Sequence, residues 1–265
     1  MDSLRREVHE RLERLEIPFG PEGIDPYGVS RAYLAEIMTW LGWFYRHYFM
    51  VRTEGIQHLP SSGRAMLVGN HSGGYALDAL MICAASFFEL EPPRLAQGMI
   101  DRFVGKLPFM TMLANKMGHL TGLPENGRRL LEDERLLLVF PEGARGTAKL
   151  YRDRHTLVRF GTGFVRLALQ TRSPVVPFAF LGGGEALPTV ANSRFLGKLL
   201  GLPYVPLTPY LLSVPLPARL EIRVGEPLRL EGTGDEEDAV IERQVDRVKS
   251  RIRELMGAAI DEVGS

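Results

Sequence analysis

His71 and Asp78 are a pair of residues in this 265-residue chain whose types and spacing suggest chemistry. They lie in 66-MLVGNHSGGYALDALM-81, where an apolar run ends at Asn70-His71 and two glycines precede the acid. A neutral imidazole accepts a proton from an alcohol near pH 7, and a carboxylate bound to the other ring N–H fixes its tautomer. The same residues also suit a strand end and the first turn of a helix, which favours acids. Taken alone, the stretch leaves both readings open.

Glu142 and Arg145 flank Gly143 in a second polar loop, 140-FPEGARG-146. An Arg guanidinium matches a phosphate with two parallel hydrogen bonds, and Glu142 could orient it or accept a substrate hydroxyl. The alternative is a local surface ion pair. Residues 145–172 hold seven basic side chains against Asp153 alone. This excess favours an anionic substrate, a phosphorylated cofactor tail or an anionic membrane surface, with a solvated helix face as the alternative.

Both loops follow apolar runs that indicate buried strands, 65-AMLVG-69 and 136-LLLVF-140. A third run, 175-VVPFAFLG-182, leads into 182-GGGEA-186. Helices predicted at 76–90, 128–134 and 156–171 alternate with these strands, which predicts an α/β fold. Ligands of open α/β sheets bind beyond the carboxyl ends of the strands. If the three strands are parallel neighbours, their loops face one crevice.

The N-terminal part of the chain predicts two helices. Residues 2–16 form an amphipathic pattern with Leu4, Val8, Leu12 and Leu15 on one side, and 18–28 is a Pro- and Gly-rich linker. Residues 30–51 are rich in aromatic side chains, with Ser30 as N-cap. That helix suits either a membrane interface or a packed core, and different faces can do each.

The rest of the chain completes the expected order of elements. We expect residues 91–127 to be mostly irregular, 219–230 to be a strand and 236–257 to be an amphipathic helix. Residues 195–215 are a candidate membrane-facing or acyl-chain-binding segment, in which Pro203, Pro206 and Pro209 exclude a regular helix; a buried connection is the alternative. The predicted division is an N-terminal helical segment, an α/β domain and a C-terminal helix, at 1–51, 52–232 and 233–265.

Composition narrows the function classes. Lys and Arg number 32, as do Asp and Glu, so the net charge of zero argues against general nucleic-acid binding. Cys83 is the single cysteine, which rules out an internal disulfide and zinc-type cysteine spacings. The charged N-terminus lacks a secretory signal, and no uncharged run reaches the ~18 residues of a membrane span. We therefore expect a peripheral or monotopic, membrane-associated protein with a cytosolic catalytic face.

Together, 70-NHSGGYALD-78, 140-FPEGAR-145 and 175-VVP-177 resemble, in order, the motifs of the glycerolipid acyltransferase family, which includes the lysophosphatidic acid acyltransferases. The resemblance covers roughly residues 50–230. It implies a mixed or largely parallel sheet covered by helices on both faces. It also implies acyl transfer from acyl-CoA or acyl carrier protein to a lipid hydroxyl at a membrane surface, without cofactor, metal or acyl-enzyme.

The resemblance also assigns site residues. His71 and Asp78 would be the catalytic base and its partner. Substrate-binding residues would be Asn70, Gly73, Gly74, Asn126, Glu142, Gly143, Arg145 and Pro177. Backbone amides near Gly73 and Gly74 would stabilise the oxyanion.

Two features depart from the family pattern. Four residues commonly separate the His and the Asp, whereas six do here. In 118-GHLTGLPENG-127, Pro124 stands where the family places an Arg that helps hold the acceptor phosphate, so a non-phosphorylated acceptor such as diacylglycerol or an alcohol is the alternative; Arg128 or Arg129 could replace the charge. A thioesterase and a non-catalytic lipid-binding protein are the rival classes. An esterase with a Gly-x-Ser-x-Gly elbow is excluded because the chain has no such pentapeptide.

Overall fold

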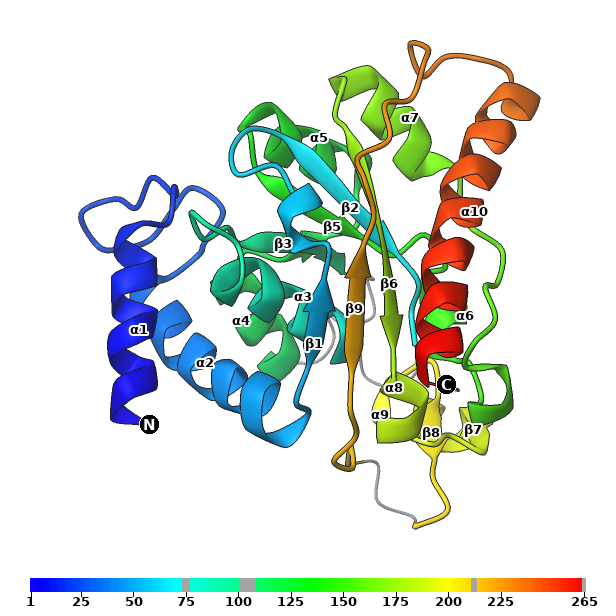
Figure 1. Ribbon diagram of the computed structural model, residues 1–265, viewed down its shortest axis with the longest axis horizontal. Coiled ribbons are helices and arrows are strands. Elements are labelled where there is room, and N and C mark those ends of the chain that lie inside the picture. Colours follow the sequence, from blue (N-terminus) through cyan, green and yellow to red (C-terminus); the bar gives the residue numbers. More distant parts are fainter. Residues whose placement is uncertain (73–76, 101–107, 211–213, 264–265) are drawn as a thin grey trace.

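The computed structural model describes residues 1–72, 77–100, 108–210 and 214–263. Its centre is a seven-stranded sheet in the order β1-β9-β6-β2-β5-β3-β4 (Figure 1). These strands are β1 (Arg52–Glu54), β2 (Ala65–Gly69), β3 (Ala96–Ile100), β4 (Leu120–Thr121), β5 (Leu136–Val139), β6 (Val175–Leu181) and β9 (Glu221–Val224).

The sheet is mixed, with parallel pairing dominant. β2 pairs in parallel with both β5 and β6, and β3 does so with β4 and β5. β9 runs antiparallel to β6 and parallel to β1. The predicted α/β architecture with a largely parallel or mixed sheet is confirmed.

Helices cover both faces of the sheet. Because successive side chains of a strand point to opposite faces, the sheet contributes to two apolar cores. Leu67 of β2 belongs to one apolar core, and its neighbours Met66 and Val68 belong to the other. The first core lies under α1 (Asp2–Glu13), α2 (Arg31–Trp43), η1 (Phe44–Tyr48) and α3 (Leu77–Phe88). The second lies under α5 (Pro124–Glu132), α7 (Gly163–Thr171) and α10 (Asp238–Val263). Figure 1 shows α1 and α2 to the left of the strands, with α7 and α10 to the right.

The N-terminal helices are part of this core. Leu4, Val8 and Leu12, at helical spacing on α1, are buried as predicted. The Ser30 side chain accepts a hydrogen bond from the Tyr33 amide and caps α2, also as predicted. Arg46 donates two hydrogen bonds to Glu7, of 2.6 and 2.7 Å, which join η1 to α1. The predicted three-part division stays a prediction, but its first and third parts share their cores with the sheet.

The expectation of an irregular segment at 91–127 is wrong. It holds β3, α4 (Pro108–Lys116) and β4. The β3 sequence, 96-AQGMI-100, contains a polar residue and a glycine, so its strand signal is weak. Gln97 donates to the Gly118 carbonyl, and a Cβ on Gly98 would lie 3.1 Å from Nδ1 of His119. These contacts, and pairing with β5, define the strand.

Other boundaries shift for local reasons. α7 begins at Gly163 instead of 156, because Gly161 and Gly163 disfavour helix before that point. The expectation that 195–215 holds no regular helix is wrong at its start, because α9 (Arg194–Leu200) precedes the prolines and ends at Gly201. It connects β7 (Ala191–Ser193) to β8 (Val205–Leu207), which form a separate two-stranded sheet. The short η2 (Ile56–His58) follows β1. Within the described residues, no helix has the length and apolar character needed to cross a membrane.

Candidate active site

The carboxyl ends of β2, β5 and β6 lie side by side at one edge of the sheet. Val68 of β2 is aligned with Val139 of β5 on one side and with Pro177 of β6 on the other. The loops that follow carry α6 (Ala144–Thr147) after β5 and α8 (Gly183–Ala186) after β6. The prediction that three polar strand ends meet is therefore confirmed.

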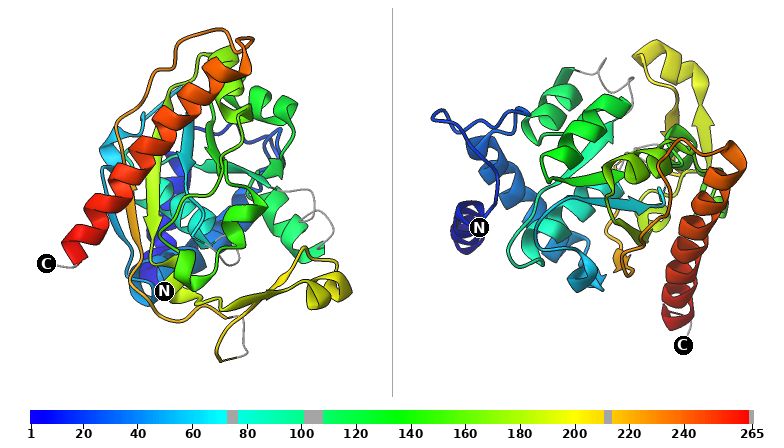
Figure 2. Two further views of the ribbon diagram at one scale, coloured as in Figure 1. Left: turned by 90° about the vertical axis from the view of Figure 1, so that its right-hand side faces the viewer. Right: turned by 90° about the horizontal axis from the view of Figure 1, so that it is seen from above.

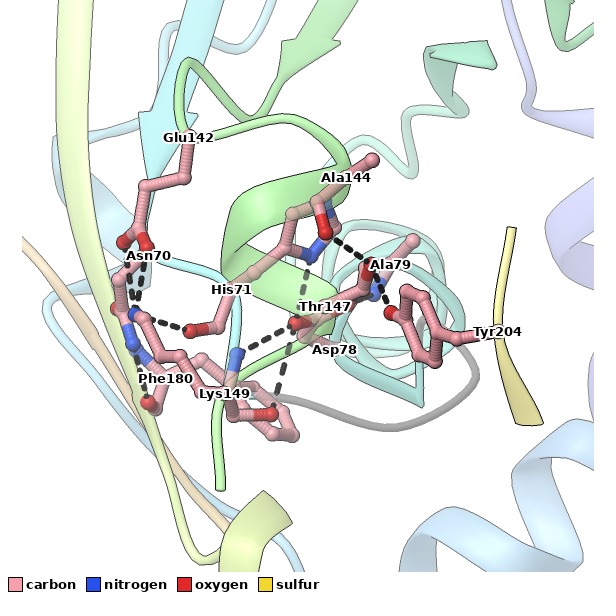
Figure 3. A network of polar contacts seen from close by, with 11 residues as sticks. Asn70, His71, Asp78, Ala79, Glu142, Ala144, Thr147, Lys149, Phe180 and Tyr204 are labelled. Carbon is pink, nitrogen blue, oxygen red and sulfur yellow. Dashed lines mark hydrogen bonds and ion pairs between the residues drawn. The ribbon is translucent and has the colours of Figure 1, made fainter. Parts of the chain in front are cut away.

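His71 and Asp78 are in direct contact across the start of α3 (Figure 3). Nδ1 of His71 lies 2.9 Å from Oδ2 of Asp78. The carboxylate is fully buried and also accepts hydrogen bonds from the Ser72 amide at 2.9 Å and the Ala79 amide at 2.8 Å. Six intervening residues thus bring the acid to the imidazole, and the longer spacing does not separate the pair.

These hydrogen bonds define the electrostatics of the pair. Burial alone would raise the pKa of Asp78. The charge and hydrogen bond of His71 and the hydrogen bonds of the two amides have a larger, opposite effect, so the pKa lies below its ordinary value. The carboxylate is therefore ionised and accepts the Nδ1 proton. The lone pair of the neutral imidazole is then on Nε2, which is the arrangement of a general base.

The neighbouring strands fix the position of the imidazole. The Phe140 ring stacks on it, with centroids 4.0 Å apart and an interplanar angle of 10°. Asn70 is fully buried, and its amide group accepts from the Phe180 N–H at 2.8 Å and donates to the Phe180 carbonyl at 2.9 Å. Asn70 therefore joins the β2 loop to β6, and the substrate contact predicted for it stays a prediction.

The loop after β6 closes on the same region. A Cβ on Gly183 would lie 2.0 Å from Oγ of Ser72, so only glycine permits this approach. Glu185 pairs with Nε of Arg154 at 2.6 Å. The third strand end predicted from 182-GGGEA-186 thus packs against the residue that follows His71.

Beneath His71 lies a buried ion pair between Glu142 and Lys149. Nζ of Lys149 lies 2.9 and 2.6 Å from the two carboxylate oxygens and donates to the His71 carbonyl at 2.7 Å. A Cβ on Gly146 would lie 2.7 Å from the Cβ atoms of both Glu142 and His71, so a glycine is needed between them. Burial raises the pKa of Glu142 and lowers that of Lys149, and their mutual attraction opposes both shifts.

This pair corrects one sequence interpretation. Glu142 does not orient Arg145; its partner is Lys149. Lys149 is one of the seven basic residues of 145–172, and it is buried because α6 turns the chain back towards β2, which no local spacing in the sequence indicates. Arg145 is exposed and donates to the Arg159 carbonyl at 3.3 Å. Gly143 is exposed and has φ 57° and ψ −150°, which favours glycine. Substrate contacts of Glu142, Gly143 and Arg145 stay predictions.

The remaining predicted site residues lie in different places. Asn126, on α5, donates to the Thr121 carbonyl at 2.9 Å. Since β5 and β3 separate β4 from β2, this position lies on the order of 15 Å along the sheet from the His71 loop. Pro177 is inside β6 and packs against Gly225. Gly73 and Gly74 lie outside the described residues.

Two further observations concern reactive side chains outside the His71 region. Cys83 is buried, as predicted, and burial raises its pKa to about 12, so the thiol stays protonated. In the described part of the chain, no cluster of His, Cys, Asp and Glu side chains could hold a metal ion.

Solved structures identify the fold class. The chain is similar to the 1-acyl-sn-glycerophosphate (LPA) acyltransferase PlsC from Thermotoga maritima, with a TM-score of 0.57 and 18% identity. The match covers 83% of this chain and 78% of that one. At this identity the likeness shows the fold, and it confirms the predicted acyltransferase-type architecture.

The family follows from the sequence. Residues 50–181, which hold His71, Asp78 and the β5 loop, match the family model described as Acyltransferase. The chain belongs to this acyltransferase family, and the family resemblance predicted from the motifs is confirmed.

Related proteins are similar over much of this chain. An uncharacterized protein of Mycobacterium tuberculosis is 35% identical over 217 residues, covering 79% of this chain and 61% of that protein. One of Mycobacterium leprae is 36% identical over 213 residues, covering 78% and 57%. The human "DGAT1/2-independent enzyme synthesizing storage lipids" is 24% identical over 177 residues, covering 66% and 52%. The chain thus spans less than two thirds of these relatives.

Proposed function

We propose that this chain is an O-acyltransferase that moves a fatty acyl group from acyl-CoA or acyl carrier protein to a lipid hydroxyl. The observation that carries the proposal is the buried His71–Asp78 pair at the carboxyl end of β2, with 2.9 Å between Nδ1 and Oδ2. A base held in this way is what acyl transfer to an alcohol requires. Membership of the acyltransferase family supports the acyl chemistry.

In the proposed reaction, Nε2 of His71 accepts the proton of the acceptor hydroxyl. The alkoxide oxygen bonds to the thioester carbonyl carbon, and the C–S bond breaks as the tetrahedral intermediate collapses. The leaving thiolate takes the proton from the imidazolium, which restores the neutral base without an acyl-enzyme. Asp78 stabilises the imidazolium and keeps its orientation. Backbone amides near Gly73 and Gly74 stay the predicted oxyanion donors. The reaction needs no cofactor, since the thioester already activates the acyl group.

The acceptor is proposed to be a glycerolipid or lysophospholipid, with a non-phosphorylated alcohol such as diacylglycerol as the second candidate. Pro124 stands where the resemblance places the phosphate-holding Arg. Arg128 donates to Gln170 at 2.7 Å, and Arg129 lies over the Tyr27 ring, so each is engaged elsewhere. This observation, together with the printed name of the storage-lipid relative, supports the second candidate.

The test is turnover of labelled acyl-CoA against lysophospholipids, diacylglycerol and simple alcohols. Replacing His71 with Ala removes the base, so we expect transfer to fall by ~10²–10⁴-fold in a folded protein. His9→Ala, an exposed histidine on α1, is the matched control and should retain activity. Near-normal turnover of His71→Ala would exclude the proposed base.

The products separate the rival functions. Acylated lipid supports the proposal, and the acceptor that yields it decides between the two candidates. Free fatty acid without acylated lipid would identify a thioesterase. Lipid binding without turnover on any acceptor, unaffected by His71→Ala, would identify a non-catalytic lipid-binding protein.

We also propose that the protein associates with a membrane surface, peripherally or monotopically, on the cytoplasmic face. A lipid acceptor requires access to a bilayer. Exposed aromatic side chains on α2 and η1, Trp40 and Phe44, support this proposal because such rings suit the headgroup region.

A further inference from the structure

We propose that residues 191–207, here called the arm, dock onto an anionic bilayer and hold the active site at the membrane surface. The arm consists of β7, α9 and β8. Figure 2 shows it, in yellow, standing out from the body of the molecule. The inference deepens the proposed function, since a lipid acceptor would reach the site from the bilayer.

The arm exposes large apolar side chains. Phe195, Leu199 and Leu200 on α9 are 79%, 74% and 59% exposed. Phe195 and Leu199 are one helical turn apart and share a face. Single exposed apolar residues are ordinary on protein surfaces, but these three and Leu196, which is 37% exposed, on one seven-residue helix form a patch that indicates an interaction.

The charges of the arm identify the occupant of this patch. Arg194 and Lys198 are exposed and also one turn apart on α9. The sequence has no acidic residue between Glu185 and Glu221. Among the described residues, neither cation of α9 makes an ion pair. Apolar side chains with cations beside them match the acyl boundary and headgroups of an anionic bilayer.

Rigid contacts connect the arm to the active site. Gly197 packs α9 against Tyr204, where a Cβ would lie 2.6 Å from the Tyr204 Cα. The Tyr204 hydroxyl donates to Oγ1 of Thr147 at 2.5 Å, and Asn192 donates to the Ala148 carbonyl at 2.7 Å. Thr147 and Ala148 immediately precede Lys149, which holds the His71 backbone.

These successive contacts place the arm beside the loop that holds Lys149 and the backbone of His71. Figure 3 shows Tyr204 entering the group of residues around His71 and Asp78. A bilayer in contact with α9 therefore lies next to the loops that carry His71 and Lys149, where we place the acyl transfer. A second copy of the chain is a poorer fit, because a two-turn helix offers far less than the ~800 Å² per partner of a stable interface.

Flotation with vesicles measures the docking directly. The full chain is mixed with one of two kinds of vesicle. The first contains phosphatidylcholine alone, and the second contains equal amounts of phosphatidylcholine and phosphatidylglycerol. The triple variant Phe195→Ser, Leu199→Ser and Leu200→Ser should reduce binding about tenfold to a hundredfold. Arg194→Gln with Lys198→Gln should abolish the preference for phosphatidylglycerol vesicles, a preference that salt should also weaken.

Ile24→Ser is the matched control, because Ile24 is an exposed apolar residue of the N-terminal linker and should leave flotation unchanged. Flotation of the triple variant equal to wild type would overturn the inference. So would analytical ultracentrifugation in which the wild type sediments as a dimer and the triple variant as a monomer, because that result would identify a second copy as the occupant.

Activity separates this inference from the proposed function. With a short-chain, water-soluble donor and acceptor, the triple variant should match wild type, while transfer to a vesicle acceptor should fall with flotation. Loss of transfer in both formats would overturn the inference that the arm acts through docking. If wild type transfers in neither format yet the flotation difference persists, the proposed function fails and the docking stands.

Discussion

Lys149 links the loop after β5 to the backbone of the proposed base. It donates to the His71 carbonyl and pairs with Glu142, and all three residues are buried. This contact joins positions 71 and 149 and therefore depends on the parallel pairing of β2 and β5. We expect Lys149 to position His71, in addition to any effect of the pair on stability.

Two substitutions separate position from stability. Lys149→Met alone leaves a buried carboxylate without its partner and should cost about 3–5 kcal/mol of unfolding free energy. Adding Glu142→Leu removes that carboxylate and should restore most of the stability, because apolar replacements of buried pairs are often neutral. The double variant should still show a low kcat with an unchanged KM, since the His71 carbonyl has lost its donor.

Urea unfolding and steady-state kinetics measure these effects. A double variant with wild-type kcat would contradict the positioning role of Lys149. A raised KM for the acceptor with kcat intact would instead support the acceptor contact that the sequence predicts for Glu142.

At the scale of elements, His119 connects β3 to the turn before β4. The Gly98 amide donates to Nδ1 of His119 at 2.5 Å, and Nε2 lies 3.9 Å from Sγ of Cys83. Burial lowers the pKa of His119 to about 4. The imidazole is therefore neutral in the folded protein at pH values where an unfolded chain would bind a proton.

This difference predicts an acid-sensitive window. Between the unfolded pKa of ~6.5 and the folded value of about 4, the unfolded state binds more protons, so stability falls as pH falls. The contribution of this residue is at most about 1.4 kcal/mol per pH unit. His119→Gln keeps an acceptor for the Gly98 amide and should flatten the slope in urea unfolding between pH 6.5 and 4. A slope equal to wild type would show that other groups cause it.

At the scale of the whole molecule, α2 and η1 serve the core and the surface at once. Met38 is fully buried, whereas Trp40 on the same helix is 51% exposed. The packed-core alternative is therefore confirmed for the Met38 face, and membrane contact of the Trp40 face stays a proposal. Deleting residues 29–51 would open the core as well as remove the exposed rings, so single substitutions test the membrane role better.

Met38→Ala and Trp40→Ser form a matched pair. Met38→Ala should lower the free energy of unfolding by about 2–5 kcal/mol and leave vesicle flotation of the folded protein unchanged. Trp40→Ser should change stability little and reduce flotation, because it removes an exposed interfacial ring. A Trp40 variant that floats as wild type would assign membrane contact to the arm instead.

The sequence alone determined the elements whose signals are local. The apolar runs of β2, β5 and β6 and the polar residues after them predicted three strand ends at one edge of the sheet. The helical spacing of Leu4, Val8 and Leu12 predicted α1 and its buried face. These predictions succeed because backbone periodicity and apolar burial depend on near neighbours in the chain.

The tertiary structure alone decided what depends on distant partners. β3 and β4 are strands because they pair with the sheet, despite weak strand signals. The partners of Asn70 and Glu142, which are Phe180 and Lys149, could not be read from the sequence, and the substrate contacts predicted for both residues stay predictions. Whether six residues could bring Asp78 to His71 also depended on how α3 packs. The physical reason is that a polar side chain taken out of water bonds to whichever group the fold places beside it, and sequence spacing does not reveal that group.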